Sequence, residues 1–508
     1  MSICEASLIL RRGIQTPSPT PMLHHSQEVS KMKGKTYRLC GTLLLTVAIF
    51  LAVACTAAPP NLRSKASASA PLLSGNAKTV ELRPLQPAAT IANVDKWALW
   101  TGDTQLRGAN VYQRRVYTEL DGIEFMGPGP VGPPFTQQDF DHLAALGANY
   151  VNLSHPGLFT ETAPFILDAD IQANLDDLLG KAAQSDIFAV ISFRTGPGRS
   201  EFTFFWDEAG DWFSEDYLND SMWQDQAAQD AWVEMWRYTA QRYRNNPIVA
   251  GYDLMVEPNS NEVGSDATNP LDIWDLDEFY DKYGGSLYDW NQLYPRIVAA
   301  IRTVDPDTPV LIGGMGYSAV EWLPRMKVLT DTRTVYMVHQ YAPFIYTHQA
   351  SDTTTCICHG HQCDLDEDGA NDLLNKAWLK NNVFSITDAF SNAHGVPVAA
   401  NEFGLMRWEP GADAFMLEQM DLLEARGMNN ALWEWAPAWE PFQVYNDFNF
   451  RHGPDPNNHS DVSSALSATI VSYWGRNTIR PSSILIFTPV ATIYLPLIFN
   501  EPAAHHRE

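Results

Sequence analysis

The chain has 508 residues, which is long enough for one large domain with appended segments. Its hydrophobic content of 45% and charged content of 19% are typical of a globular protein and exclude disorder as the state of the main body. Acidic residues outnumber basic residues by 60 to 34, and because the resulting formal charge of −26 repels a phosphate backbone, we expect no nucleic acid partner.

The N-terminal region contains the pattern of an export signal. Residues 1–31 have no signal character, and we expect translation to start at Met32. Basic residues follow Met32, and an apolar run then ends in the sequence LAVAC. This sequence resembles a bacterial lipobox, which predicts a lipoprotein signal peptide over residues 32–55 and a lipid on Cys55, with an uncleaved membrane anchor as the alternative. In either case we expect an exported chain, either a cell-surface or periplasmic lipoprotein or a secreted protein.

The remaining chain divides into three segments. Residues 56–95 are rich in Ala, Pro and Ser without an apolar period, which predicts a tether. The folded domain is expected over residues 96–475. The last segment, residues 476–508, is apolar, but Pro489 and Pro496 argue against a membrane helix. It is predicted to be a short C-terminal extension that packs on the domain or adds a strand pair.

Within the domain, short β-branched runs alternate with longer segments of helical period, which is the pattern of parallel strands joined by crossover helices. Eight strands are predicted: LRGAN at 106, NYVNLS at 149, FAVISF at 188, VAGYDLMVE at 249, PVLIGG at 309, TVYMVHQY at 334, VPVAANE at 396 and NALWEW at 430. The predicted fold class is α/β, a closed (β/α)8 barrel with loop insertions. A doubly wound open sheet is the alternative, but closure brings the polar residues at the strand ends to one face.

Two glutamates stand at the ends of predicted strands. Glu257 follows the fourth strand and precedes Pro258, while Glu402 ends the seventh strand. Hydrolysis of a glycosidic bond with retention needs an acid that protonates the leaving oxygen and a carboxylate that attacks the anomeric carbon, about 5–5.5 Å apart. Either glutamate alone is often a solvated loop residue, whereas both at one end of a barrel form a candidate catalytic pair.

The ordered motifs RGAN, VEP, HQY, NEFG and LWEW resemble glycoside hydrolase family 5, a group of (β/α)8 retaining glycosidases. The resemblance covers most of residues 100–440. It implies that Glu257 is the acid/base and Glu402 the nucleophile. It also implies that Tyr341 donates a hydrogen bond to the nucleophile and that His339 lines the cleft.

The resemblance also implies a set of substrate-binding residues, among them a tryptophan at the end of the eighth strand that serves as a sugar platform. An indole face stacks on the apolar face of a pyranose ring, whereas the usual alternative for Trp is burial in the core. The substrate-binding residues expected are Asn110, His339, Tyr341, Asn401, Trp433 and Trp435.

Two positions depart from the family pattern. Val256 precedes the acid/base where family members usually carry an Asn that contacts the sugar 2-hydroxyl, and the second strand lacks the usual Arg that supports the nucleophile. Two interpretations stay open. Either Asn259, Arg194 or Arg107 compensates, or catalysis is slow or absent.

The predicted function is therefore an O-glycosyl hydrolase that cleaves a β-linked glucan, mannan or related oligosaccharide by double displacement. No cofactor is required for this chemistry. The expected partners are an oligosaccharide or polysaccharide and, through Cys55, a membrane. The alternative is a catalytically impaired barrel that binds carbohydrate at the cell surface.

An acidic insertion follows the sixth strand. Asp364, Asp366 and Asp368 before Gly369 resemble the first half of a calcium loop, but Asn375 replaces the acid usual at the twelfth position. A structural calcium site and an acidic surface loop both stay open.

Three cysteines precede these aspartates in the same insertion. Cys356, Cys358 and Cys363 predict one disulfide and one spare thiol in an exported chain. Their spacing is not a strong zinc signature. The insertion is expected at the rim of the cleft, where it shapes access of the substrate.

Overall fold

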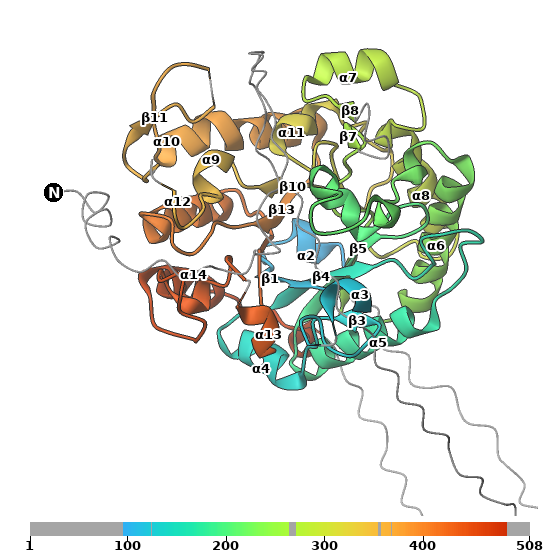
Figure 1. Ribbon diagram of the computed structural model, residues 1–508, viewed down its shortest axis with the longest axis horizontal. Helices are drawn as coiled ribbons and strands as arrows, with labels where there is room; N and C mark the ends of the chain where they lie inside the picture. Colours follow the sequence, from blue (N-terminus) through green and yellow to red (C-terminus); the bar gives the residue numbers. More distant parts are fainter. Residues whose placement is uncertain are drawn as a thin grey trace, which may run out of the picture. The chain divides into compact units, whose positions relative to one another are not determined.

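Eight parallel strands close into a barrel in the computed structural model of the protein (Figure 1). The structure describes residues 95–484, apart from 123, 264–270, 354–356, 367 and 445. Around the barrel the order is β1-β14-β13-β10-β9-β6-β5-β4. The strands are β1 (Arg107–Tyr112), β4 (Tyr150–Pro156), β5 (Phe188–Thr195), β6 (Val249–Asp253), β9 (Val310–Gly313), β10 (Thr334–Gln340), β13 (Val398–Phe403) and β14 (Asn430–Leu432). The predicted (β/α)8 barrel is confirmed, and each of the eight predicted runs overlaps one strand of the barrel.

Helices surround the barrel (Figure 1). The longer ones are α4 (Gln137–Ala145), α5 (Ala169–Gln184), α6 (Gln226–Tyr243), α7 (Leu276–Tyr283), α8 (Trp290–Arg302), α11 (Ser385–His394), α12 (Ala412–Glu424) and α14 (Ala465–Trp474). The short helices are α2 (Ala98–Thr101), α3 (Thr118–Asp121), α9 (Phe344–Thr347), α10 (Lys376–Trp378), α13 (Glu440–Gln443) and α15 (Pro481–Ile484).

Shorter elements decorate the loops between strands and helices. Three two-stranded pairs are β2 (Arg114–Arg115) with β3 (Val131–Gly132), β7 (Glu262–Val263) with β8 (Leu271–Asp272), and β11 (Gln362–Cys363) with β12 (Asp372–Leu373). The 3-10 turns are η1 (Glu201–Phe204), η2 (Trp206–Glu208), η3 (Glu215–Tyr217), η4 (Ser221–Trp223), η5 (Val320–Arg325) and η7 (Phe450–His452), and η6 (Leu379–Phe384) is a π-helical turn.

Local sequence explains where the major helices begin. Asp168, Asp225 and Asp289 cap α5, α6 and α8, because each carboxylate accepts a hydrogen bond from a main-chain N–H of the first turn. Thr136 begins α4 with a capping box. Each of these helices buries one apolar side against the barrel, which is the arrangement expected of crossover helices.

The barrel interior is apolar toward the N-terminal ends of the strands, and the chain before β1 closes this end. Leu99 and Trp100 of α2 belong to one apolar cluster with inward-facing residues of seven of the strands, such as Leu311 and Val335. The Trp100 indole donates a hydrogen bond to the Ala250 carbonyl at 3.0 Å. This plug seals the N-terminal end of the barrel, so the open end is the one where the strands terminate.

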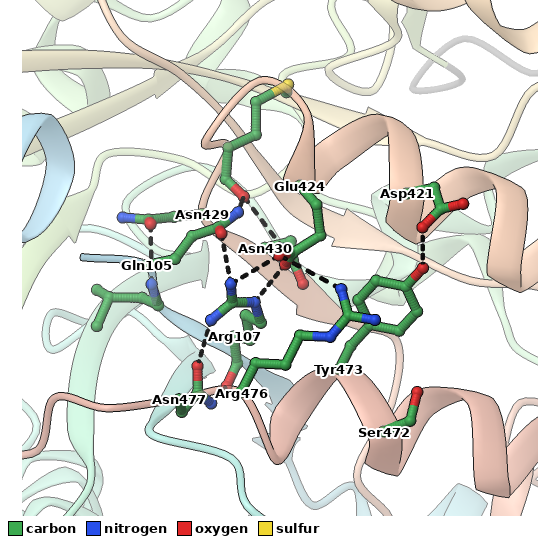
Figure 2. A network of polar contacts seen from close by, with 12 residues as sticks. Gln105, Arg107, Asp421, Glu424, Asn429, Asn430, Ser472, Tyr473, Arg476 and Asn477 are labelled. Atoms are coloured by element: carbon green, nitrogen blue, oxygen red, sulfur yellow. Dashed lines mark hydrogen bonds and ion pairs between the residues drawn. The ribbon is translucent and has the colours of Figure 1, made fainter. Parts of the chain in front are cut away.

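A polar network ties the C-terminal segment to the N-terminal end of the barrel (Figure 2). Arg107, the first residue of β1, forms an ion pair with Glu424 of α12, and its Nη1 donates to Asn477 Oδ1 at 2.8 Å. Asn477 Nδ2 in turn donates to the carbonyls of Arg107 and Gly147 at 3.0 and 2.9 Å. The described start of the predicted C-terminal extension therefore packs on the domain.

Several predicted segments lie outside the described residues. They are the upstream residues 1–31, the signal peptide 32–55 with Cys55, the tether as far as residue 94, and the apolar end 485–508. These stay predictions. Among the helices that the structure describes, none is long and apolar enough to cross a membrane.

Candidate active site

Two glutamates and a histidine meet at the open end of the barrel. One carboxylate oxygen each of Glu257 and Glu402 and one ring nitrogen of His339 all lie within 4.8 Å of one another. His339 and Glu402 are register partners on β10 and β13. Glu257 lies beyond the end of β6, in a loop where its φ is +53°. A non-glycine residue in this left-handed region is strained, and such strain is concentrated at functional sites.

His339 is held between the two carboxylates. Its Nδ1 lies 3.0 Å from Glu257 Oε1 and 3.7 Å from Glu402 Oε1. Burial disfavours the charged imidazolium, but the carboxylates of Glu402, Glu257 and Asp253 outweigh burial and raise the pKa of His339 to about 9. The site therefore contains a buried cation at neutral pH, and its charge lowers the pKa of Glu402.

Tyr341 orients Glu402. The Tyr341 hydroxyl donates a hydrogen bond to Glu402 Oε1 at 2.7 Å. Burial and the adjacent Glu402 keep the pKa of Tyr341 well above its ordinary value, so the hydroxyl stays protonated and remains a donor. Burial raises the pKa of Glu402, and the Glu257 carboxylate raises it further, while His339 and the Tyr341 hydrogen bond act in the opposite direction.

A layer of amides supports the site from inside the barrel. Asn152 Nδ2 donates to Asn110 Oδ1 at 2.6 Å, and Asn110 Nδ2 donates to the Asn401 carbonyl at 3.1 Å. Asn401 Nδ2 donates to Asp253 Oδ2 at 2.8 Å. Asn110 and Asn401 are both 0% exposed. The prediction that these two residues contact sugar is therefore wrong, because their amide groups bind protein partners below the cleft.

The two tryptophans of the LWEW motif have different surroundings. Trp433 is half-buried at the open end, with its ring 5.7 Å from the ring of Tyr112. Trp435 is 1% exposed, and its indole donates a hydrogen bond to the Asp139 carbonyl at 3.0 Å. Trp435 thus packs between barrel and helices, so its predicted sugar contact is wrong. Trp433 remains the candidate platform.

The structure distinguishes among the three residues offered as substitutes for the missing family Arg and Asn. Arg107 is the first residue of β1 and so lies at the opposite end of the barrel, where it contacts Asn477 (Figure 2). Asn259 is 0% exposed. Its Oδ1 accepts a hydrogen bond from Arg199, and its Nδ2 donates one to the Thr203 carbonyl. Arg194 at the end of β5 lies near the carboxylates, since its charge lowers the pKa of Glu402 and its guanidinium carbon is 5.7 Å from the Trp433 ring centroid. Arg194 is itself paired with Glu201 at 3.0 Å.

A third carboxylate near the site escaped the sequence interpretation. Glu434 follows the platform Trp433 and is 5% exposed. Burial raises the pKa of Glu434 to about 8, and the nearby Glu402 contributes to the increase, so Glu434 holds a proton at neutral pH. It accepts a hydrogen bond from Asn446. The only sign of this carboxylate in the sequence was its position directly after Trp433, the tryptophan predicted as the sugar platform.

The acidic insertion brings its three predicted calcium ligands together. One carboxylate oxygen each of Asp364, Asp366 and Asp368 lie within 4.8 Å of one another. However, the Asn375 side chain accepts hydrogen bonds from the first turn of α10, and is therefore turned to the helix. The three carboxylates have the charge and the oxygen ligands that a divalent cation such as calcium needs. The bound ion stays a prediction. The melting temperature of the protein, measured with and without a chelator, tests it.

The cysteines of the same insertion behave as predicted where the structure describes them. Cys358 is in a disulfide, and Cys363 has a free, half-buried thiol. This confirms the prediction of one disulfide and one spare thiol for these two residues. Cys356 lies outside the described residues.

Comparisons with known sequences point to one family. A family model described as Cellulase (glycosyl hydrolase family 5) matches residues 109–438, more than half of the chain. Endoglucanase C of Acetivibrio thermocellus is 24% identical over 219 residues, which are 42% of this chain and 52% of that protein. A beta-xylosidase of Phanerodontia chrysosporium is 24% identical over 222 residues, 41% of this chain and 38% of that protein. The chain spans about half the length of the curated relatives it matches.

Solved structures share the fold. A crystal structure titled as a glycoside hydrolase aligns with a TM-score of 0.52 at 21% identity, covering 73% of this chain and 99% of its own. Thermotoga maritima Cel5A in complex with cellobiose aligns with a TM-score of 0.50 at 15% identity, covering 74% of this chain and 100% of its own. At these identities the likeness shows the barrel fold alone.

Proposed function

Because this chain belongs to glycosyl hydrolase family 5, the cellulase family, we propose that it hydrolyses β-linked glycosidic bonds with retention of configuration. The observation that carries the proposal is the spacing of the two glutamates. An oxygen of Glu257 and an oxygen of Glu402 lie within 4.8 Å. Retaining enzymes hold their carboxyl groups about 5–5.5 Å apart, whereas inverting enzymes leave roughly 6.5–9.5 Å for a water molecule.

The proposed reaction has two steps. In the first, Glu402 attacks the anomeric carbon while Glu257 gives its proton to the leaving oxygen, so the glycosidic bond breaks and a glycosyl ester forms on Glu402. In the second, Glu257 takes a proton from water, the water oxygen attacks the anomeric carbon, and the ester bond to Glu402 breaks. Two displacements at one carbon restore its original configuration.

Residues next to the two glutamates have separate roles in the proposed reaction. The Tyr341 hydroxyl fixes one oxygen of Glu402, which leaves the other oxygen to face the anomeric carbon. The His339 imidazolium and the Arg194 guanidinium both lower the pKa of Glu402, and thus favour the ionised nucleophile against burial. Trp433 provides the aromatic face on which a sugar ring stacks.

The proposed substrate is a β-glucan, with mannan or a related oligosaccharide as further candidates. Supporting this choice are the names of the relatives, since several are endoglucanases. A barrel that binds carbohydrate without cleaving it is not favoured, because both carboxylates and the hydrogen bond from Tyr341 to Glu402 are present.

We expect the full chain to release reducing sugar from soluble β-1,4-glucan, with lower release from mannan and least from xylan. The physical reason is that the paired glutamates act on any β-linked pyranose that the cleft admits, while the loops select among them. Reducing-sugar assays across the three polysaccharides measure this order. Absence of release from all three, with folding verified, would contradict the hydrolase.

Cell fractions measured in the same assay test the proposed export and lipid anchor. This part of the proposal is supported only by the sequence LAVAC, which ends in Cys55. Activity is expected in the membrane fraction and is expected to move to the soluble fraction in Cys55→Ser. Equal distribution of both proteins would argue against the anchor.

Replacing His339 with Asn is expected to move the acid limb of the pH profile of kcat/KM upward by about one pH unit. Since the imidazolium lowers the pKa of Glu402, its loss lets burial raise that pKa further, and Glu402 becomes protonated at a higher pH. Full pH profiles of both proteins give the shift. An acid limb that stays in place or moves downward would show that His339 does not act on the nucleophile.

A further inference from the structure

A fully buried arginine without an acidic partner lies beside the candidate acid/base. Arg199 follows β5 in the loop TGPGRS and is 0% exposed. Within the part of the chain that the structure describes, Arg199 forms no ion pair, although burial of a charge is costly unless it is compensated. Burial and the neighbouring Arg194 lower the pKa of Arg199 to about 10, so the guanidinium is still charged at neutral pH.

The guanidinium is compensated by carbonyl oxygens on both sides of Glu257. Nη1 donates to the carbonyls of Arg194 at 2.9 Å and Val256 at 2.7 Å. Nη2 donates to the carbonyl of Glu257 at 2.7 Å and to Asn259 Oδ1 at 3.2 Å. One planar group thus holds the main chain at Val256 and Glu257 and the side chain of Asn259, and it connects that loop to the end of β5.

Among the described residues, only the Arg199 guanidinium donates a hydrogen bond to the Glu257 carbonyl. Glu257 has a φ of +53°, which an L-residue rarely adopts without support. Its predecessor Val256 is 1% exposed and contributes an apolar side chain, so it offers no side-chain hydrogen bond to the loop. The Val256 N–H is bound to the Phe193 carbonyl at 2.9 Å, again on β5. The main chain at Val256 and Glu257 is therefore held by β5 and the turn that follows it, while His339 contacts the Glu257 carboxylate.

We infer that Arg199 is a positioning residue for the acid/base, and that its clamp on the Val256 and Glu257 carbonyls aims the Glu257 carboxyl at the leaving oxygen. The inference rests on the proposed glycosidase function. Arg199 acts mainly through the main chain, since three of its four hydrogen bonds go to main-chain carbonyls and the fourth goes to Asn259 Oδ1. A displacement of the acid by about 1 Å is enough to reduce proton transfer on the order of 100-fold.

The test compares two substrates in Arg199→Lys, where the charge is kept but the planar clamp is lost. An unactivated oligosaccharide needs its leaving oxygen protonated, whereas a 2,4-dinitrophenyl β-glycoside leaves without a proton. Since kcat/KM reports only the steps up to formation of the glycosyl ester, kcat/KM for the oligosaccharide is expected to fall about 100-fold while that for the dinitrophenyl glycoside stays near the wild-type value.

Arg107→Lys is the matched control. Arg107 is also a buried arginine with hydrogen bonds to several elements (Figure 2), but as the first residue of β1 it lies at the closed end of the barrel. This variant is expected to lower the melting temperature without changing the ratio of the two kcat/KM values. A purely structural role for Arg199 would give the same pattern as the control, and equal losses on both substrates or no loss on either would overturn the inference.

A second variant covers failure of Arg199→Lys to fold. Asn259→Ala removes one of the four acceptors of the guanidinium, and it is expected to change the same ratio in the same direction by a smaller factor. An unchanged ratio in a folded Asn259→Ala protein would then overturn the inference. Wild-type protein that cleaves neither substrate would instead overturn the proposed function, so the two failures are distinguishable.

Discussion

Glu402→Gln is expected to reduce kcat/KM on both the oligosaccharide and the dinitrophenyl glycoside by about 10⁴-fold or more, on the scale of removing a covalent nucleophile. The amide can accept the Tyr341 hydrogen bond, but it cannot form the glycosyl ester. Because the attack by Glu402 is needed whatever the leaving group, activation of the substrate gives no rescue. Steady-state kinetics on the two substrates measure both losses.

The melting temperature of Glu402→Gln separates lost chemistry from lost folding. A carboxyl whose folded pKa is raised destabilises the fold as the pH rises above its unfolded value, and burial raises the pKa of Glu402. At neutral pH the neutral amide is therefore expected to melt no lower than wild type. A lower melting temperature with partial activity would indicate that Glu402 has a structural role instead.

Glu409→Gln is the matched control for this prediction. Glu409 is 4% exposed on the loop after β13 and accepts a hydrogen bond from Gln349 at 2.6 Å. Burial raises the pKa of Glu409 to about 9, so the side chain is neutral at pH 7 and Gln reproduces its charge. Activity on both substrates is expected to stay at the wild-type level.

Glu257→Gln is expected to lower kcat/KM on the oligosaccharide by roughly 10²- to 10⁴-fold, the usual contribution of a general acid, while kcat/KM on the dinitrophenyl glycoside is largely kept. The second step still needs Glu257 as base, so the glycosyl ester accumulates and product appears as a burst followed by a slow phase. Rapid-mixing kinetics with the dinitrophenyl glycoside measure the burst.

The two glutamate variants thus differ in a way that assigns their roles. Loss on both substrates marks the nucleophile, and loss restricted to the unactivated substrate marks the acid. A Glu257→Gln protein equally impaired on both substrates, with no burst, would show that Glu257 is not the acid/base.

The barrel could be predicted because its strands are buried on both faces. Such strands consist of continuous β-branched and apolar residues, and runs such as FAVISF stand out between helical segments. The end of a strand is less certain. The run VAGYDLMVE was predicted as one strand, whereas β6 ends at Asp253 and Glu257 lies in the loop beyond it. Glu257 nevertheless lies beside His339 and Glu402, because the Leu254 and Val256 N–H groups stay bound to carbonyls of the neighbouring strands β9 and β5.

The direction of individual side chains could not be predicted. Asn401 and Glu402 are sequence neighbours, yet Asn401 binds Asp253 inside the barrel while Glu402 faces the cleft. The pairing register shifts near these residues, between Val338 and His339 and again between Ala400 and Phe403. Such irregularities reorient side chains near active sites, and they depend on neighbouring strands and not on local sequence.

The clamp on the acid/base loop escaped prediction for a related reason. Arg199 and Glu257 are far apart in sequence and meet because β5 and β6 are neighbours in the barrel. Val256, which departs from the family pattern, was the visible sign that the loop is held in a different way. Only the structure shows the residue that holds it.

Trapping the glycosyl ester tests the central claim most directly. A 2-deoxy-2-fluoro-β-glycoside with a dinitrophenyl leaving group, built on the sugar that the full chain releases, slows both steps and preserves the ester for mass spectrometry of peptides. The account predicts a single glycosyl label on the peptide that contains Glu402, and no label in Glu402→Gln. A label on another residue, or an unlabelled protein whose first product has the inverted anomeric configuration, would contradict it.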